Sequence, residues 1–220
     1  IANRTLEKAD TLHQLYAQSG SHDLIFQGGT ALRWCYGGSR FSEDLDFVTP
    51  LAPDKVKAKL SRALKTVEKA MAPHFGAGAL TVTDKSTRKH TLKTIVDYHP
   101  ATSREKISIK LEFEGTRQDS RPDTKNHVLS ALPAVSYLIT AGDFRVPHPN
   151  SVLVVETIPE ILSDKVRALL ERRYLKGRDI FDVWYLRSVL KASVAKTIVE
   201  RKLGMYAWPF KMESTDKLSG

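Results

Sequence analysis

The sequence predicts an α/β (α+β) fold, in which a mixed sheet flanked by helices is followed by a helical C-terminal domain. Apolar residues recur at helical spacing in the first and last parts of the chain and at alternate positions in between. The chain has 220 residues, of which 41% are hydrophobic, so it can bury the core of one large domain or two small ones. We therefore expect an α/β domain over residues 1–150 and a helical domain over residues 151–220.

The first domain alternates between helical and strand-like patterns. Residues 4–19 predict an amphipathic helix that Gly20 ends, and a short apolar strand follows at residues 24–27. A second strand opens at Asp44, and a long helix is expected up to Pro73. Two or three strands are then predicted, around residues 80–83, 92–98 and 106–114. In the last of these, polar and apolar side chains alternate, which is typical of a strand with one face in the core.

The rest of the chain divides into a loop-rich connection and a helical end. Residues 115–149 contain many turn formers, and the domain boundary is placed there. A Thr-x-x-Glu capping pattern that begins at Thr157 predicts the start of a helix. Another helix is expected near Arg178, and residues 202–220 are expected to form a loosely structured end.

Composition narrows the class of protein. Lys and Arg number 34 against 25 Asp and Glu, a formal net charge of +9, which favours a polyanionic partner, although many soluble proteins are basic. Cys35 is the single cysteine of the sequence, which excludes an internal disulfide and a cysteine-based zinc cage. No apolar run approaches the length of a membrane span. We expect a cytoplasmic location and no membrane partner, although a chain that begins at Ile1 leaves an earlier segment open.

One helix is expected to concentrate much of the positive charge. Its cations are a candidate surface for a polyanion, but a solvated helix face explains any one of them equally well. These residues are Lys55, Lys57, Lys59, Arg62, Lys65 and Lys69.

The first candidate site lies where the strand at residues 24–27 turns into a helix, at Gly28, Gly29 and Thr30. Backbone amides at a helix N-terminus bind phosphate, and glycines let the phosphate approach closely. A glycine pair is also common in turns that have no further role. The loop that follows adds Arg40 and Ser42, a countercharge and a hydroxyl. We interpret the whole segment as a site for nucleotide phosphates.

Asp44 and Asp46 are candidates for a metal site. They lie two residues apart on a predicted strand, so both carboxylates face the same side of the sheet. Two such carboxylates suit Mg²⁺, which shares its other positions with water and substrate phosphates. A glycine turn followed by this acidic pair indicates metal-assisted nucleotidyl transfer.

Glu112 is a candidate third carboxylate. It lies on the polar face of the strand at residues 106–114, and a neighbouring strand with Asp44 would bring it to the same metal ions. The alternative is a solvent-facing charge that pairs with Lys110. The strand pattern alone favours this alternative.

Lys165 and Asp182 each interrupt the apolar face of a predicted helix. A buried charge is costly unless it meets a partner or reaches water. The two side chains either pair across their helices or face a common cleft.

Four segments together resemble the AbiEii/AbiGii toxin nucleotidyltransferases, members of the DNA polymerase beta-like nucleotidyltransferase superfamily. They are Gln-Gly-Gly-Thr-Ala-Leu at residues 27–32, Arg-Phe-Ser-Glu-Asp-Leu-Asp-Phe at residues 40–47, Lys165 with Arg-Ala-Leu at residues 167–169, and Arg-Asp-x-x-Asp at residues 178–182. The segments follow the expected order between residues 24 and 186. The resemblance implies a nucleotidyltransferase-like fold and the toxin half of a type IV-like toxin–antitoxin or phage-abortive system.

The resemblance also implies roles for the candidate residues. Phosphates of the NTP would be held by Gly28, Gly29, Thr30 and Ser42, two Mg²⁺ ions by Asp44 and Asp46, and a further phosphate by Lys165. Asp182, with Asp179, would complete the site, and Glu112 fits a third acidic position at which these toxins vary. The implied reaction adds a nucleoside monophosphate to RNA, the 3′ end of tRNA being one implied acceptor, and the implied protein partner is a cognate antitoxin, often a winged-helix protein.

Two other classes of function remain at this point. The first is a non-catalytic nucleotide-binding module of the same fold, against which the joint presence of Asp44, Asp46, Lys165 and Asp182 argues. The second is a metal-dependent nuclease or phosphatase, since paired aspartates serve those reactions too. The glycine turn ahead of the aspartates favours the use of an NTP.

Overall fold

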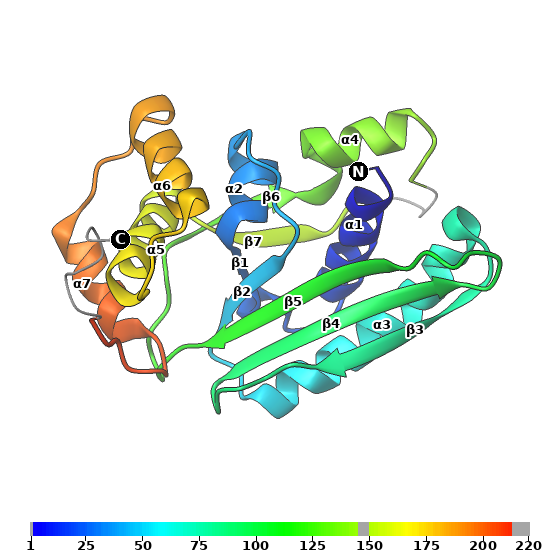
Figure 1. The fold of residues 1–220 in the computed structure, drawn as a ribbon, viewed down its shortest axis with the longest axis horizontal. Helices are drawn as coiled ribbons and strands as arrows, with labels where there is room; N and C mark the ends of the chain where they lie inside the picture. Colours follow the sequence, from blue (N-terminus) through cyan, green and yellow to red (C-terminus); the bar gives the residue numbers. More distant parts are fainter. Residues whose placement is uncertain (1, 145–149, 213–220) are drawn as a thin grey trace.

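A mixed sheet of seven strands runs through the computed structural model, which describes residues 2–144 and 150–212 (Figure 1). Its strand order is β3-β4-β5-β2-β1-β7-β6. The pairs β2·β5 and β1·β7 are parallel, and the other pairs are antiparallel. The strands are β1 (Ile25–Gln27), β2 (Leu45–Thr49), β3 (Gly78–Asp84), β4 (Thr91–Pro100), β5 (Ile107–Gly115), β6 (Thr124–Val128) and β7 (Val152–Glu156). The mixed α/β fold predicted from the sequence is confirmed.

The helices form two groups at the two ends of the molecule (Figure 1). At one end lie α1 (Ala2–Tyr16), α3 (Pro53–Phe75) and α4 (Pro133–Thr140). At the other end lie α5 (Ile158–Glu171), α6 (Gly177–Trp184) and α7 (Lys196–Met205), and α2 (Gly28–Tyr36) stands between the groups. Among the described residues, the structure contains no helix that is both long and apolar enough to span a bilayer.

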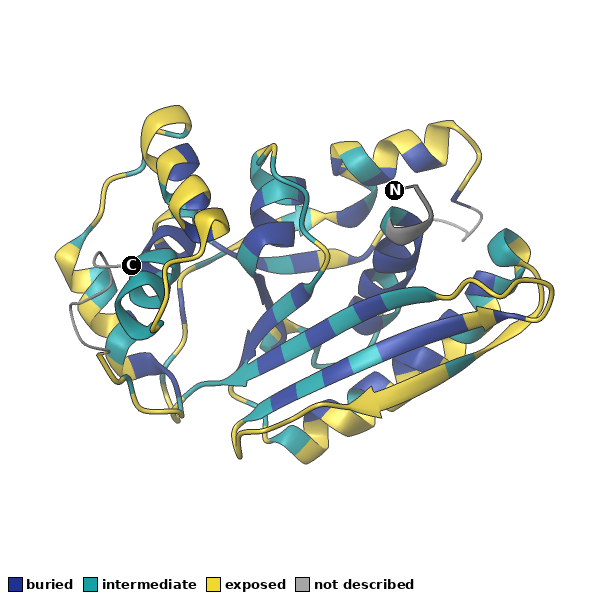
Figure 2. Cartoon of the chain, viewed as in Figure 1, coloured by how far each residue is buried: buried dark blue, intermediate teal, exposed yellow. Residues whose placement is uncertain are grey.

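Strand alternation gives the centre of the sheet one apolar face and one polar face. Leu45 and Phe47 of β2 are fully buried in the main core with α1 and α3, and the Phe47 ring stacks on Phe113 of β5 with centroids 4.8 Å apart. Along β5, buried residues alternate with half-buried ones (Figure 2). Because side chains alternate between faces, Asp46 and Glu112 point away from this core.

The other face of β1 and β2 is covered by the end of α7. Ile25 and Val48 pack with Met205 and Tyr206 in a second apolar cluster. A loosely structured end was expected from residue 202 onward, which is wrong for residues 202–206: Lys202 is fully buried, and Met205 and Tyr206 nearly so. This packing was not predicted because the charged and aromatic side chains of this segment show no clear apolar periodicity in the sequence. Residues 213–220 of that expectation lie outside the described residues.

The predicted helices and strands of residues 1–114 are present with small shifts of their ends. Pro73 lies inside α3, which continues for two residues beyond it. The chain after residue 150 first returns to the sheet as β7, beside β1, before the helical part begins at Ile158. The division into domains at residue 150 remains a prediction, and residues 145–149 beside it lie outside the described part.

Candidate active site

A cleft separates the polar face of β1, β2 and β5 from helices α5 and α6. It is lined by nine residues that were singled out from the sequence: Gly28, Gly29, Arg40, Ser42, Asp44, Asp46, Glu112, Lys165 and Asp179. They come from four separate parts of the chain and meet only through the fold. Thr30 and Asp182, the other two predicted residues, are buried beside the cleft and do not line it.

The two glycines at the start of α2 are required by close packing. Gly28 has a φ of +78°, a conformation that L side chains rarely adopt. A Cβ at Gly28 would lie 2.5 Å from Asp46 Oδ2, and a Cβ at Gly29 would lie 2.5 Å from Arg40 Nη2. The glycines therefore bring the amides of a helix N-terminus next to a carboxylate and a guanidinium, where an anion and a cation can bind together.

Thr30 fixes the start of β2. Its hydroxyl donates a hydrogen bond of 2.5 Å to the carbonyl oxygen of Asp44, and its side chain is fully buried. This contact ties the α2 N-terminus to the residue just before β2. The Thr30 side chain thus positions Asp44 and does not itself reach the cleft.

The three candidate carboxylates meet because β2 and β5 are adjacent parallel strands. Asp46 lies directly opposite Glu112 in the register, and Asp44 and Asp46 share a face. Glu112 also lies 3.1 Å from Lys93 and 3.5 Å from Lys110. Glu112 is therefore ion-paired with Lys110, as one interpretation expects, and it lies across the strands from Asp46. Its role as a third metal ligand stays a prediction.

The acidic pair is a chemically suitable cation site. Burial, and then the negative charges of Asp44 and Glu112, raise the pKa of Asp46 to about 6. A divalent cation would relieve this repulsion, and Mg²⁺ commonly uses only one or two protein carboxylates beside substrate phosphates. The described residues contain no group of three or more His, Cys, Asp or Glu arranged to hold a metal ion, so a metal at Asp44 and Asp46 would need further ligands that this arrangement does not supply.

Arg40 and Lys165 are held at the cleft by the buried Asp182. Arg40 binds Asp182 through two hydrogen bonds of 2.9 Å, from Nε and Nη2, and Lys165 Nζ lies 2.7 Å from Asp182 Oδ2. Burial alone would raise the pKa of Asp182, but the Arg40 hydrogen bonds and the Lys165 charge outweigh it and lower the pKa. Of the two alternatives drawn from the sequence, the pairing across the helices is present. Lys165 also lines the cleft, whereas Asp182 does not.

Asp179 performs a similar task one turn earlier on α6. It lies 3.2 Å from Lys165 Nζ and forms an ion pair with Arg172, and its side chain is almost fully buried. Burial lowers the pKa of Lys165, with a smaller contribution from the positive charge of Arg40. The helical side of the cleft carries Lys165, Arg167, Arg172 and Arg178 beside Asp164 and Asp179, and the sheet side carries Asp44, Asp46, Glu112 and Glu114 beside Lys110.

Comparisons with known proteins agree with this geometry. Residues 10–217 match the family described as the nucleotidyl transferase AbiEii toxin of type IV toxin–antitoxin systems. The chain belongs to the AbiEii family. A search of curated proteins gave no match.

Two solved structures share the fold. One, from H. pylori and described as a proposed nucleotidyltransferase, has a TM-score of 0.59 at 20% sequence identity, covering 90% of this chain and 72% of that one. The other, JHP933 from Helicobacter pylori, has a TM-score of 0.54 at 18% identity, covering 89% of this chain and 69% of that one. At these identities the likeness shows the fold alone, one shared with a protein described as a nucleotidyltransferase.

Nine cleft residues of this AbiEii family member were given no role in the site from the sequence, although four of them lie in the segments that carry the family resemblance. They are Gln27, Lys110, Glu114, Ile161, Asp164, Arg167, Ala168, Arg172 and Arg178. Gln27 could have been found, because it precedes the glycine pair and pairs with Asp46 in the β1·β2 register. Arg172 and Arg178 could also have been found, because they stand at the two ends of a short, strongly basic segment between two predicted helices.

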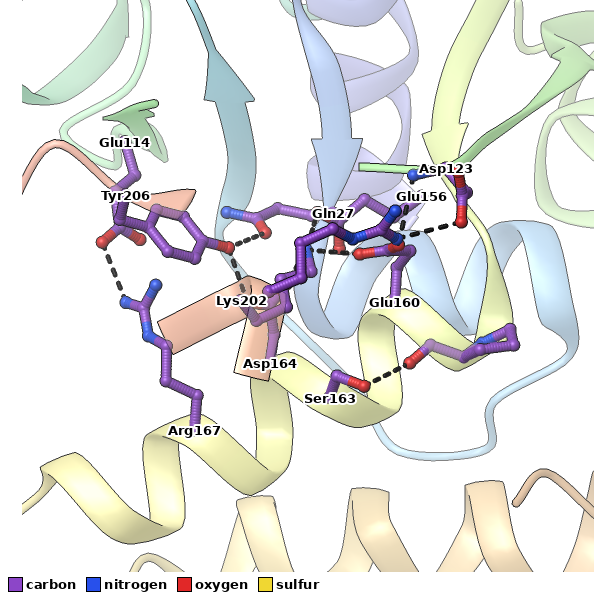
Figure 3. Close-up of polar contacts among 12 residues, drawn as sticks. Gln27, Glu114, Asp123, Glu156, Glu160, Ser163, Asp164, Arg167, Lys202 and Tyr206 are labelled. Atoms are coloured by element: carbon purple, nitrogen blue, oxygen red, sulfur yellow. Dashed lines mark hydrogen bonds and ion pairs between the residues drawn. The ribbon is translucent and has the colours of Figure 1, made fainter. Parts of the chain in front are cut away.

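The helix that carries Lys165 is anchored from behind by a buried lysine of α7 (Figure 3). Lys202 Nζ lies 2.5 Å from Glu156, 3.2 Å from Glu160 and 2.7 Å from Asp164. The Tyr206 hydroxyl donates a 2.6 Å hydrogen bond to Asp164 as well. These contacts fix α5 against β7 and α7, and they set where its cleft-facing side chains lie.

Proposed function

We propose that the cleft binds an NTP together with Mg²⁺ and transfers its nucleoside monophosphate to a hydroxyl of RNA. The observation that carries this proposal is the contact between the α2 N-terminus and the acidic pair, where Gly28 lies directly against Asp46. This contact supports the proposal because it brings backbone amides that would bind phosphate next to carboxylates that would bind a metal. The 3′ end of tRNA is the acceptor that we would test first.

The residues of the cleft divide into phosphate ligands and carboxylates. Backbone amides at Gly28 and Gly29, and the Ser42 hydroxyl, would bind the phosphates of the NTP. Lys165 would add a positive charge opposite them, held in place by Asp179 and Asp182. We assign Thr30 and Asp182 to positioning, since neither side chain lines the cleft.

Asp44 and Asp46 would hold Mg²⁺, with two ions as the proposed number and Glu112 as a further ligand. When bound, Mg²⁺ would lower the pKa of the attacking hydroxyl and neutralise the charge of the leaving pyrophosphate. The acceptor oxygen forms a bond to the α-phosphorus while the bond to pyrophosphate breaks. The hydroxyl proton passes to Glu112 or to water, because Glu112 is the carboxylate that faces Asp46 across the strands.

Membership of the AbiEii family supports an antitoxin as the protein partner. We place the reaction in the cytoplasm, where NTPs and RNA are available. The single cysteine, Cys35, is consistent with this compartment because the sequence has no pair of thiols to oxidise.

The proposal is tested by incubating the protein with each α-labelled NTP, Mg²⁺ and total RNA, beside the Asp46→Asn variant. We expect label to appear on RNA with at least one NTP and to disappear in the variant. The Asp46→Asn fold should persist in thermal unfolding, since the Asp46 side chain lies at the cleft surface. Transfer by the folded variant contradicts the site assignment.

Other outcomes of the same experiment separate the competing functions. Shortened RNA without incorporated label indicates a nuclease. NTP binding without transfer to any RNA indicates a non-catalytic module. Label on a different acceptor retains the nucleotidyl transfer and rejects RNA as its substrate.

A further inference from the structure

A second groove adjoins the cleft on the side of the α5–α6 connection. It encloses about 570 Å³ and shares four charged residues with the cleft: Glu112, Glu114, Arg167 and Arg172. Its other walls come from the β3–β4 turn, the start of β4 and the end of α5. We call it the basic groove and define it by Arg88, Lys93, Arg172, Arg173, Tyr174 and Lys176.

The basic groove contains more cations than its own carboxylates can pair with. The groove is lined by six cations, Arg88, Lys93, Arg167, Arg172, Arg173 and Lys176, and by three carboxylates, Glu112, Glu114 and Glu171. The three carboxylates are already paired, Glu112 with Lys93 and the other two with Arg167. Within residues 2–144 and 150–212, Arg88, Arg173 and Lys176 form no ion pair.

The crowding of these cations affects Lys176. The positive charges of Arg172 and Arg178 lower the pKa of Lys176, and Lys110 and Lys93 add to the effect. Lys176 is exposed, so repulsion between cations, and not burial, is the main cause. A bound polyanion would relieve this repulsion.

The basic groove also offers aromatic surface. Tyr174 is 70% exposed, and Arg173 lies over its ring at 5.3 Å from the centroid. Arg88 lies 5.0 Å from the ring centroid of Trp208, which is also partly exposed. Exposed aromatic rings and guanidinium planes stack with nucleic-acid bases, and each stacked base contributes to affinity with little sequence preference.

We propose that the basic groove binds a single strand of the RNA acceptor and leads its 3′ end into the cleft. The proposal rests on the nucleotidyl transfer proposed above and names the path of its second substrate. Shared walls with the cleft favour the acceptor, because a strand in the groove ends beside Asp46 and Glu112. Free cations would contact the phosphates, and Tyr174 would stack on a base.

The test compares two variants that each lose three exposed cations. The groove variant is Arg88→Ala/Arg173→Ala/Lys176→Ala, and the control is Lys55→Ala/Lys65→Ala/Lys69→Ala on the solvent face of α3. Binding of a labelled single-stranded RNA of about ten nucleotides is followed by fluorescence anisotropy at several salt concentrations. Binding of a fluorescent NTP analogue is measured in parallel.

We expect the groove variant to bind RNA about tenfold or more weakly than the parent. The slope of log affinity against log salt concentration should become shallower by about one to two, because each lost phosphate contact contributes about 0.7 to it. NTP binding should stay unchanged in both variants. The control should bind RNA within about twofold of the parent, because its cations lie on a different surface. Equal losses in the two variants would reduce the effect to net charge and overturn the proposal.

Two further arms identify the ligand and separate this proposal from the one on which it rests. Poly-L-glutamate replaces RNA in the first arm, and groove-dependent binding of this polymer without RNA binding would indicate an acidic protein segment and reject the proposal. In the second arm, Asp46→Asn should bind RNA like the parent while losing transfer. If the parent binds RNA through the groove but transfers no nucleotide, the groove proposal stands and the proposed nucleotidyl transfer is rejected. If a groove variant keeps normal RNA affinity and transfers nucleotide to RNA, the groove proposal alone is rejected.

Discussion

Lys110 Nζ donates a hydrogen bond of 2.9 Å to Asp44 Oδ2, and the same ammonium lies 3.5 Å from Glu112 Oε2. Residues 44 and 110 directly precede Leu45 and Leu111, the first pair in the parallel register of β2 and β5. Burial would lower the pKa of Lys110, but the hydrogen bond to Asp44 and the charges of Asp44 and Glu112 outweigh it and raise the pKa. The ammonium is therefore a protein cation beside the carboxylates that we assign to Mg²⁺.

This contact predicts that Lys110→Met strengthens binding of a divalent cation. Without the Lys110 ammonium, no positive charge competes with the metal ion for Asp44. The repulsion between the ammonium and the divalent cation is also removed. We expect the affinity for Mn²⁺ to rise about tenfold, equivalent to about 1.4 kcal/mol. Titration followed by electron paramagnetic resonance measures it without any dependence on activity.

Lys93→Met is the matched control, because Lys93 pairs with Glu112 and not with Asp44. A smaller gain is expected for this variant. Weaker Mn²⁺ binding by Lys110→Met than by the parent would mean that Lys110 orders the carboxylates for the metal and does not compete with it.

Lys165→Ala should strongly weaken the affinity for NTP and only modestly lower the free energy of unfolding. The carboxylates that it leaves behind keep other partners, since Asp182 retains two hydrogen bonds from Arg40 and Asp179 retains Arg172. We expect a loss of about 1–2 kcal/mol in the free energy of unfolding. Urea denaturation gives the stability, and a fluorescent NTP analogue gives the affinity.

Asp182→Ala should be much more destabilising than Lys165→Ala. It leaves two cations, Arg40 and Lys165, without their shared carboxylate, and removing one side of a buried pair costs about 3–5 kcal/mol. If Lys165→Ala unfolds the protein as readily as Asp182→Ala does, Lys165 is chiefly structural. The two variants thus decide between the interpretations that the sequence left open.

The site could be predicted from sequence as far as local chemistry determined it. Gly28 and Asp46 lie in short segments whose residue types already restrict the backbone and the ligand, so their meeting in the cleft was expected. Lys165 and Asp182 were recognisable because a charge on an apolar helix face needs a partner. Their pairing with each other was one of two alternatives, and spacing could not decide between them, since the choice depends on how α5 packs against α6.

The parts that were missed depend on contacts between distant segments. In the sequence, Lys110 is an ordinary polar residue of an alternating strand. Its contact with Asp44 depends on the pairing of β2 with β5. Lys202 sits in a helix with a weak apolar pattern, and its burial follows from three carboxylates supplied by β7 and α5. Long-range pairing of this kind leaves no periodic signal in the sequence.

Lys202→Met should strongly destabilise the fold. The variant leaves Glu156, Glu160 and Asp164 facing one another without the ammonium that binds all three. We expect a loss of about 3–5 kcal/mol in the free energy of unfolding, measured by urea denaturation. Lys196→Met on the same helix is the control: Lys196 is almost fully exposed, so the change should stay within about 0.5 kcal/mol. Similar losses in the two variants would contradict an anchoring role for Lys202.

Asp10 of α1 is fully buried, and neither of its carboxylate oxygens has a hydrogen-bond partner among the described residues. Burial raises the pKa of Asp10 to about 7, from a usual value of 3.8. Between these two values the folded protein holds a proton at Asp10 that the unfolded chain releases. Stability should therefore fall as pH rises from about 4 to about 7, and the contribution of Asp10 should be constant above that range.

Asp10→Asn should remove this part of the pH dependence. A change of one in a pKa corresponds to about 1.4 kcal/mol, so the stability of the variant relative to the parent should rise by up to about 4 kcal/mol between pH 4 and pH 8. Any fixed cost of burying the amide cancels in this difference between two pH values. Urea denaturation at each pH measures it, with Asp143→Asn at an exposed position as the control. Parallel stability curves for Asp10→Asn and the parent would mean that Asp10 is ionised in the folded protein, which its enclosed position in α1 argues against.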